Sequence, residues 1–313
     1  MSHANIVEEP TFANVTAAQL RIQSYLQKTP IIESSKINRQ FGTKVYFKCE
    51  NLQTTGSFKF RGALNAVLSL PPEIRQKGII AHSSGNHGIA LAKVAQQLQI
   101  PCTIVVPYNA PLTKHQKIAA NQANIVLCEP TLAAREASLK EVKVQTGAVE
   151  IHSSNHPHVI AGAGSVALEF LSEMPNLEVL ITPVGGGGLL SGTGLVAAHQ
   201  ASPIDVFGAE PRGADDAYCS LKAGKIIRKS AQTVADGLRS ALGNYTFEVI
   251  RQTVRDILLV EDDSIIESQR WLQEELGFTV EPSAAIVLGA IATYTNLFKD
   301  REVGVVLSGG NVD

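Results

Sequence analysis

The sequence lacks the features of membrane, secreted and nucleic-acid-binding proteins. The formal net charge of the 313 residues is −2, so no basic surface for nucleic acid or an acidic membrane is expected. No apolar run is long enough to cross a bilayer, because even the run from Ala284 to Leu288 is followed by Gly289. Residues 1–5 contain neither the basic nor the apolar part of a secretory signal. We therefore expect a cytoplasmic protein with no nucleic-acid partner and no membrane partner.

Cysteine is also scarce, and the cysteines are scattered. They are Cys49, Cys102, Cys128 and Cys219, and no two of them form a C-x-x-C pair. This spacing favours reduced thiols over disulfides or a zinc site. Hydrophobic residues make up 44% of the chain and charged residues 18%, which is typical of a compact α/β protein. A chain of 313 residues is long for a single core, so two domains are expected.

Short β-branched runs alternate with helical patterns along most of the chain. Strands are predicted at residues 44–49, 79–81, 102–106, 125–127, 149–151, 179–181, 206–209, 256–260 and 303–307. This alternation produces βαβ units and parallel sheets. We predict an α/β fold of two doubly wound domains, a larger one from residues 1–75 and 154–313 and a smaller one inserted at 76–153. Near the N-terminus, Thr16–Gln19 resembles a capping box and predicts a helix from there to Leu26.

One lysine lies in a loop, residues 54–62, between a predicted strand and a helix predicted at 63–70. Lys59 has Phe58 and Phe60 on either side. A lysine wedged between aromatic rings is desolvated, which favours its neutral amine. A neutral amine is a nucleophile toward aldehydes. Taken alone, this would be an ordinary surface lysine at a helix start, and its interest depends on glycine-rich segments further along the chain.

Four consecutive glycines, Gly185–Gly188, stand between a predicted strand and a predicted helix. Adjacent backbone N–H groups without side-chain cover can close around a phosphate at a helix N-terminus. A Walker loop would continue with Lys and Ser or Thr, but Leu189 follows here. A dinucleotide site stays open, because Glu210 lies near the offset of a ribose-binding acid. A tight turn is the structural alternative, but it would not need four glycines, so phosphate binding is favoured.

Two further loops follow predicted strands. In Ser83–Gly88, hydroxyls and backbone donors suit a carboxylate at a helix N-terminus, whereas an N-cap alone would leave Asn86 unexplained. Ser308–Asn311 would by itself be a C-terminal turn. A reactive lysine, a phosphate site and a carboxylate site together describe pyridoxal 5′-phosphate acting on an amino acid.

With these motifs in this order, nearly the whole chain resembles the fold type II (β-family) pyridoxal-phosphate enzymes of the serine racemase and serine/threonine dehydratase group. The resemblance is strongest to the serine racemases, on Cys128–Pro130 with Arg135, on Ala209–Pro211 with 214–216, and on Ala235–Gly237. It implies interconversion of L- and D-serine, with β-elimination of serine to pyruvate and ammonia. The alternative is an ammonia-lyase (dehydratase) of L-serine, L-threonine or threo-3-hydroxyaspartate. A nucleotide-binding module or NAD oxidoreductase, and a catalytically silent paralogue, are rivals of other classes.

The resemblance also implies the roles of individual residues. Lys59 would bind the cofactor aldehyde covalently and act as the base on one face. The other cofactor contacts would be Phe58 on the ring, Asn86 on the 3′-oxygen, Ser308 on the pyridine nitrogen, and Gly185, Gly186, Gly187 and Gly188 on the phosphate. The substrate contacts would be Ser83, Ser84, Asn86, His87, Arg135, Asp236 and Ser240. The larger domain would hold the cofactor, and the smaller one would close over the amino-acid substrate.

Racemisation needs a proton donor and acceptor on each face of the reacting carbon. With Lys59 on one face, the hydroxyl of Ser84 could serve the other, so both are candidate catalytic residues. The resemblance further implies a site for Mg²⁺ (or Ca²⁺ or Mn²⁺) at Glu210, Ala214 and Asp216, whose oxygens suit such ions, and a homodimer. Ile89 stands where the nucleotide-activated mammalian racemases carry a polar residue, which argues against stimulation by ATP.

Overall fold

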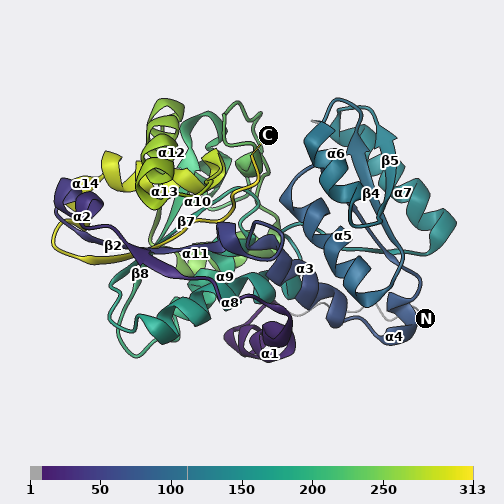
Figure 1. The fold of residues 1–313 in the computed structure, drawn as a ribbon, viewed down its shortest axis with the longest axis horizontal. Helices are drawn as coiled ribbons and strands as arrows, with labels where there is room; N and C mark the ends of the chain where they lie inside the picture. The colour runs from purple at the N-terminus through teal and green to yellow at the C-terminus, as the bar shows by residue number, and fades with distance from the viewer. Residues whose placement is uncertain (1–8, 111, 313) are drawn as a thin grey trace.

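The computed structural model describes residues 9–110 and 112–312, and it contains two mainly parallel β-sheets covered by helices (Figure 1). In the described residues, the larger sheet has the order β1 (Ile31–Glu33), β2 (Lys44–Lys48), β10 (Glu302–Val306), β7 (Val179–Pro183), β8 (Asp205–Pro211) and β9 (Asp256–Val260). The smaller has the order β5 (Asn124–Cys128), β4 (Cys102–Pro107), β3 (Ile79–His82) and β6 (Val149–Glu150). Only the β1–β2 pair is antiparallel within these sheets. The predicted α/β fold is confirmed.

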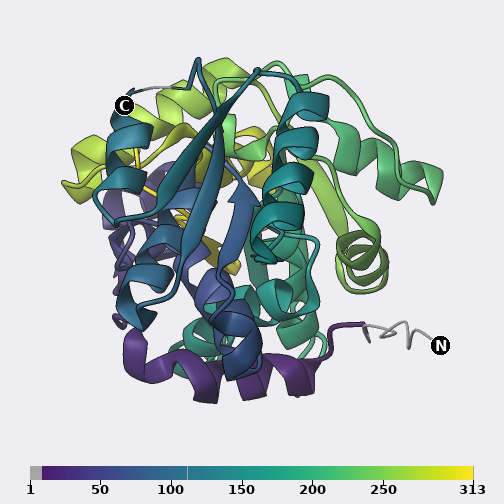
Figure 2. The same cartoon turned by 90° about the vertical axis from the view of Figure 1, so that its right-hand side faces the viewer.

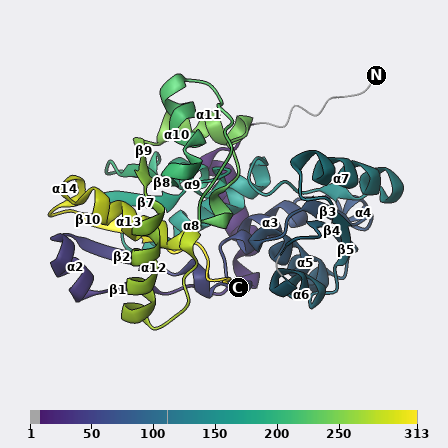
Figure 3. The same ribbon diagram turned by 90° about the horizontal axis from the view of Figure 1, so that it is seen from above.

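Helices cover both faces of each sheet. Those around the smaller sheet are α4 (Pro72–Arg75), α5 (Asn86–Leu98), α6 (Leu112–Ala119) and α7 (Leu132–Thr146). The others are α1 (Phe12–Ile22), α2 (Ser35–Phe41), α3 (Lys59–Leu68), α8 (Pro157–Glu173), α9 (Gly188–Ala197), α10 (Asp216–Ala223), α11 (Asn244–Thr253), α12 (Asp262–Leu276), α13 (Pro282–Thr293) and α14 (Thr295–Phe298). Figure 2 shows the smaller sheet between its helices, and Figure 3 shows α3 and the C-terminal end of the chain between the two sheets.

Alternation of side chains along the strands divides each sheet between two cores. In β3, Ile79 packs with α5 and α6, whereas the next residue, Ile80, packs with Leu139 of α7 on the other face. In β7, Ile181 faces the core formed with α12 and α13, and Leu180 faces α8 and α9. Both faces of each sheet are therefore buried, as a parallel sheet requires.

Some element boundaries differ from the sequence prediction. The predicted capping box at Thr16 is wrong, because α1 begins at Phe12 and its cap is Thr11, which pairs with Asn14. The helix predicted at 63–70 begins at Lys59 instead, so the lysine is its first residue rather than part of the preceding loop. Residues 1–5, for which no secretory signal is predicted, lie outside the described residues. In the described part of the chain, no helix is long and apolar enough to cross a membrane, and all four cysteines are free.

A buried ionic cluster fixes the start of α3. The guanidinium of Arg61 binds both oxygens of Glu50 at 2.8 Å and one oxygen of Glu169 at 3.2 Å. The ammonium of Lys48 lies 2.5 Å from the second oxygen of Glu169. Arg61, Glu50 and Lys48 are fully buried, and the partly exposed Glu173 also lies 3.6 Å from the ammonium of Lys48. The cluster joins β2, α3, α8 and the short helix η2 (Glu50–Leu52), and it lies two residues from Lys59.

We predict that Arg61→Met lowers the free energy of unfolding by about 3–5 kcal/mol, because it leaves Glu50 charged and buried without its partner. Chemical denaturation monitored by circular dichroism would measure the loss. The control is Arg255→Met, which removes the exposed pair of Arg255 with Asp205 and should leave stability close to that of the parent. Equal stability of the two variants would show that the cluster does not hold α3 in place.

Candidate active site

The candidate active site lies at the carboxyl ends of the strands of the larger sheet. The segment after β2 leads to Lys59 at the start of α3 (the Lys59 loop), the segment after β10 carries Ser308, and the segment after β7 carries the four glycines. In the sheet, β10 lies between β2 and β7, so the loop of Ser308 is flanked by the other two. Ligands in open parallel sheets bind at such a point, where the direction of strand order changes.

The amine of Lys59 is buried at the start of α3. Its Nζ donates to the carbonyl oxygen of Ser153 at 2.9 Å and lies 5.0 Å from the ring centroid of Phe58. Burial lowers the pKa of Lys59 to about 8, and the negative charge of Glu281 opposes this shift. Of the two flanking phenylalanines, only Phe58 lies against the amine, because Phe60 packs into the core of the smaller sheet. The amine is therefore neutral in a substantial fraction of molecules near pH 8.

The Lys59 loop and the Ser308 loop are hydrogen-bonded to each other. The backbone N–H of Phe58 donates to the carbonyl of Ser308 at 3.0 Å, and that of Gly310 donates to Gly56 at 2.9 Å. The side chain of Asn311 donates to the carbonyl of Thr55 at 2.8 Å. These bonds hold the buried Ser308 beside the start of α3.

The four glycines form a cup before α9. Gly187 has φ +80°, a left-handed conformation that favours glycine, and a Cβ at Gly185 would lie 2.8 Å from the Cα of Leu238. A Cβ at Gly186 would collide with the hydroxyl of Ser154. This hydroxyl is buried and has no hydrogen-bond partner among the described residues, so it is free to bind a ligand in the cup. The first amides of α9 also lack intrahelical acceptors, and together these donors fit a phosphate.

The loop before α5 offers donors of the same kind. The hydroxyl oxygen of Ser83 accepts from the amides of Gly85 and Gly88, at 3.3 and 3.2 Å, and thereby shapes the turn. No described atom lies within 4 Å of a Cβ position on Gly85, so the space above the helix start is open. The amides of Asn86 and His87, at the first two positions of α5, have no intrahelical acceptors. A carboxylate would be stabilised there.

His87 offers an acceptor rather than a donor from its ring. Nε2 lies 2.8 Å from the carbonyl of Ile151, so Nε2 must carry the hydrogen. Burial lowers the pKa of His87 to about 3, which leaves the ring neutral and Nδ1 unprotonated. Nδ1 is buried without a partner in the described chain. A carboxylate would therefore contact the backbone N–H of His87, whereas the ring could accept from an ammonium or hydroxyl group.

Asn86 contacts a carboxylate that the sequence did not single out. Its Nδ2 lies 2.9 and 3.0 Å from the two oxygens of Glu281, and its Oδ1 accepts from Asn311 at 2.9 Å. Burial raises the pKa of Glu281 to about 7, and the hydrogen bond from Asn86 opposes the rise. Glu281 and Ser154 were both missed, since an acid before Pro282 and a serine in a short linker are common and carry no distinctive signal.

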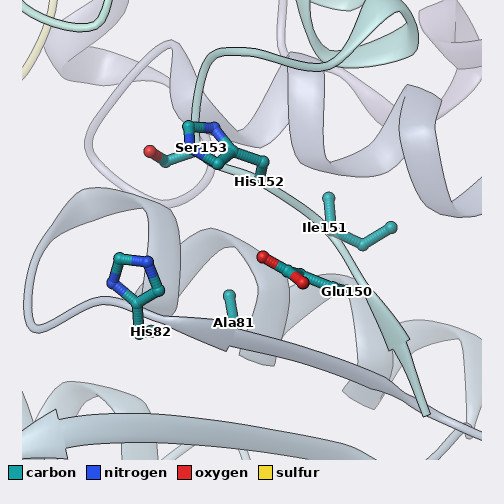
Figure 4. Close-up of a pocket in the computed structure, with 6 residues that line it drawn as sticks. All are labelled: Ala81, His82, Glu150, Ile151, His152 and Ser153. Atoms are coloured by element: carbon teal, nitrogen blue, oxygen red, sulfur yellow. The ribbon is translucent and has the colours of Figure 1, made fainter. Parts of the chain in front are cut away.

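The segment after β6 provides the carbonyl that binds the amine of Lys59. A cavity of about 10 Å³ lies between His82, Glu150, His152 and Ser153, and Figure 4 shows the residues that line it. His152 Nδ1 accepts from the amides of Ser154 and Asn155, at 3.2 and 2.9 Å, which fixes the backbone whose Ser153 carbonyl binds Lys59. Burial lowers the pKa of both His82 and His152.

The remaining predicted substrate residues lie in different places. Ser240 is next to the glycine cup, because its Cβ would be 3.7 Å from a Cβ on Gly186. Asp236 is exposed and pairs with Lys114 of α6. Arg135 lies on α7, close enough to His82 to lower its pKa after the larger effect of burial, and its Nε has no partner in the described chain. Asn86 and His87 therefore lie at the start of α5 with Ser84 in the loop before it, Ser240 lies beside the cup, and Arg135 lies on α7 near His82.

The predicted metal residues lie at the end of β8. The two oxygens of Glu210 accept from the amides of Ala217 and Tyr218, both at 2.8 Å. Oδ2 of Asp216 is buried and has no partner among the described residues. Burial raises the pKa of Glu210 to about 8 and that of Asp216 to about 6. Across residues 9–110 and 112–312, no three His, Cys, Asp or Glu side chains are clustered to hold a metal ion.

Comparison with known proteins agrees with this geometry. The family model described as "Pyridoxal-phosphate dependent enzyme" matches residues 22–309. A serine racemase from Dictyostelium discoideum is 43% identical over 97% of this chain and 95% of its own length. An L-threo-3-hydroxyaspartate ammonia-lyase from Saccharomyces cerevisiae is 40% identical over 97% of this chain and 94% of its own. The structure of maize serine racemase matches with a TM-score of 0.95 and 39% identity, over 98% of this chain and 95% of that chain. The buried amine, the phosphate cup and these similarities lead to one conclusion: the chain belongs to the family of pyridoxal-phosphate dependent enzymes.

Proposed function

We propose that this protein is a pyridoxal-phosphate-dependent serine racemase that interconverts L- and D-serine and also eliminates serine to pyruvate and ammonia. The observation that carries the proposal is the amine of Lys59, which binds the carbonyl of Ser153 next to the Ser154 that lines the glycine cup, and which follows the Phe58 amide that binds the Ser308 loop. The 43% identity to a serine racemase over nearly the whole chain supports the choice of substrate. An ammonia-lyase acting on serine, threonine or threo-3-hydroxyaspartate is the second candidate, supported by the 40% identity to a hydroxyaspartate ammonia-lyase.

The residues of this chain would divide the reaction among them. When bound, pyridoxal phosphate withdraws electrons from the α-carbon of the amino acid. The glycine cup and the Ser154 hydroxyl would hold the phosphate, and the amides at the start of α5 would orient the substrate carboxylate. Lys59, with its lowered pKa, would take the α-proton on one face. The hydroxyl of Ser84 would return a proton on the other face.

We also propose that residues 76–153 form a mobile domain that closes on the part formed by 1–75 and 154–313. Each part has its own sheet, and the core of Ile80, Val105, Cys128, Leu139 and Ala148 lies wholly within 76–153, which supports its movement as a unit. On the other face of the smaller sheet the core continues into α3, where a hinge would have to act. Polar contacts between the two parts near the site include Asn86 with Glu281, Lys114 with Asp236, and Lys117 with Asn311 at 3.1 Å. Closure would exclude water and bring Arg135 closer to the substrate carboxylate.

A divalent cation, Mg²⁺, Ca²⁺ or Mn²⁺, is proposed at Glu210, Ala214 and Asp216. The unpaired, buried Oδ2 of Asp216 supports it, because a buried carboxylate oxygen without a partner is costly. We further propose a cytoplasmic homodimer. The exposed side chains of Tyr25 and Leu52 support an interface, since Gln27 and Gln53 bond to each other and hold these two segments together.

The first prediction from this function concerns Ser84. Incubated with L-serine, pyridoxal phosphate and Mg²⁺, the parent should form D-serine and pyruvate, whereas Ser84→Ala should lose at least about tenfold in D-serine formation and keep pyruvate formation, because one of the two proton donors is gone. Chiral chromatography measures the products. Ser172→Ala, a change at an exposed serine of α8, is the control and should behave like the parent.

Pyruvate without D-serine from the parent would contradict racemisation. The protein would then be a dehydratase, and threonine and the 3-hydroxyaspartates would be the next substrates to compare.

The pH dependence of cofactor uptake tests Lys59. Because burial lowers the pKa of the amine to about 8, the neutral, nucleophilic fraction grows as pH rises through 8. The rate at which the apoprotein takes up pyridoxal phosphate should therefore rise with pH, with an inflection near pH 8. Visible absorbance measures this rate. Lys59→Ala should show no such band. An inflection near 10, the range of an exposed lysine, would contradict the buried state of the amine.

Mg²⁺ should raise the thermal midpoint of the parent, since a ligand that binds only the folded state stabilises it. Asp216→Asn should lose this shift, while Asp263→Asn, at an exposed acid of α12, should keep it. Differential scanning fluorimetry with and without a chelator provides the measurement. A shift that survives in Asp216→Asn would place the cation elsewhere.

A further inference from the structure

Glu281 is a buried carboxylate whose role goes beyond the residues considered so far. It precedes α13, and only 5% of its surface is exposed. Its carboxylate forms no ion pair within the described residues, and it accepts hydrogen bonds from the side chain of Asn86 and the backbone of Asn311. A buried carboxylate that forms no ion pair is expensive to keep, so its presence is not explained by stability.

The chain makes room for this carboxylate. A Cβ at Gly309 would lie 2.5 Å from Oε1 of Glu281, which is closer than such atoms can approach. The backbone N–H of Glu281 donates to the carbonyl of Gly309 at 3.0 Å. Gly309 is therefore required by Glu281, and the Ser308–Asn311 loop is shaped around the carboxylate rather than being a simple turn.

The contacts of Asn86 leave only one orientation for its amide. A carboxylate can only accept, so Glu281 must face Nδ2. On the other side, Nδ2 of Asn311 donates to Oδ1 of Asn86 at 2.9 Å. The orientation of Asn311 is fixed in turn, because its Oδ1 accepts from the ammonium of Lys117 at 3.1 Å and its Nδ2 also donates to the carbonyl of Thr55. Along the network from Lys117 through Asn311 and Asn86 to Glu281, each side chain therefore donates a hydrogen bond to the next.

We propose that Glu281 is a positioning residue that fixes the amide of Asn86 so that its second Nδ2 hydrogen points at the 3′-oxygen of the cofactor. This inference rests on the proposed contact between Asn86 and that oxygen. Because Nδ2 lies 2.9 and 3.0 Å from the two oxygens of Glu281, a single hydrogen can serve both of them, which leaves the other hydrogen for the cofactor. A reversed amide would place Oδ1 of Asn86 against both the carboxylate of Glu281 and the 3′-oxygen. When the 3′-oxygen is ionised, none of these three groups can donate a hydrogen bond. The network therefore favours the ionised 3′-oxygen.

The ionisation of Glu281 makes this effect dependent on pH. Burial raises the pKa of Glu281 to about 7; the nearby Asp236 adds to the rise, while Asn86, Lys114 and the backbone of Asn311 oppose it. Lys59 faces the same carboxylate from α3. Above pH 7 the carboxylate only accepts and Asn86 is fixed. Below pH 7 the protonated acid can also donate, and the reversed amide becomes accessible.

The test is the absorbance spectrum of the holoenzyme without substrate, recorded from pH 6 to 9. The visible band of the form with an ionised 3′-oxygen should dominate in the parent and decrease as pH falls through about 7. In Glu281→Gln, whose amide can donate as well as accept, this band should be weaker at pH 8 and lose its transition near 7. The affinity for pyridoxal phosphate should fall about tenfold, the effect of one hydrogen bond to a charged group.

Two further variants separate positioning from general damage. Asn311→Ala removes the donor to Oδ1 of Asn86 and should weaken the band while keeping the transition near pH 7. Glu281→Asp keeps a carboxylate and should restore part of the band. The control is Glu275→Gln, a carboxylate that accepts from Ser34 at 2.7 Å away from the site, and its spectrum should match that of the parent. Thermal melting of the apoproteins shows whether each variant is folded.

The outcomes distinguish this inference from the proposed function. A parent that binds the cofactor, with an unchanged spectrum and pH profile in both Glu281→Gln and Asn311→Ala, would overturn the positioning role alone. Because no substrate is present, that result would not depend on whether the enzyme racemises or dehydrates serine. A parent without any cofactor band would overturn the proposed function, and the positioning role with it.

Discussion

The candidate site depends on the buried ion pair between Arg61 and Glu50. A helix that begins at a reactive lysine cannot be held by its first turn alone, and Phe58 at the N-cap provides no side-chain cap. The guanidinium two residues later supplies the missing constraint, because it binds Glu50 and Glu169 from two other segments. Burying such charges is costly unless every partner is in place, so the cluster forms only when β2, α3 and α8 are docked together. The position of the Lys59 amine follows from that docking.

The second constraint is the position of β10 in the larger sheet. The last strand inserts between β2 and β7, which come from opposite sides of the inserted segment. Its following loop therefore meets the Lys59 loop, to which Phe58 and Gly310 bind it through backbone hydrogen bonds. Residues separated by about 250 positions in the chain form one surface in this way. Because the last strand of the chain lies in the middle of the sheet, the site is formed by loops from distant parts of the sequence, and no single loop contains it.

Local patterns predicted the fold class and the loops, but not the contacts between them. Lys59 and the glycines at 185–188 are recognisable because their chemistry needs a particular residue type next to a strand. The start of α1 was misplaced because Thr11 and Thr16 are both acceptable caps, and only burial of Val15 and Ala18 against α8 and the larger core distinguishes them. Glu281 could not be predicted, since its partner Asn86 is 195 residues away and its own neighbours are unremarkable in type.

The electrostatics of the site follow from burial combined with helix ends. Burial shifts the pKa of Lys59, His87 and Glu281 toward their neutral forms, which leaves His87 neutral and Lys59 still mainly protonated near pH 7. Backbone amides at the starts of α9 and α5 provide the positive potential for a phosphate and a carboxylate. Backbone dipoles do not titrate, so they can hold both anions over a wide pH range. The side chains that do titrate are left for moving protons, which is the division of labour that proton transfer at an amino-acid carbon requires.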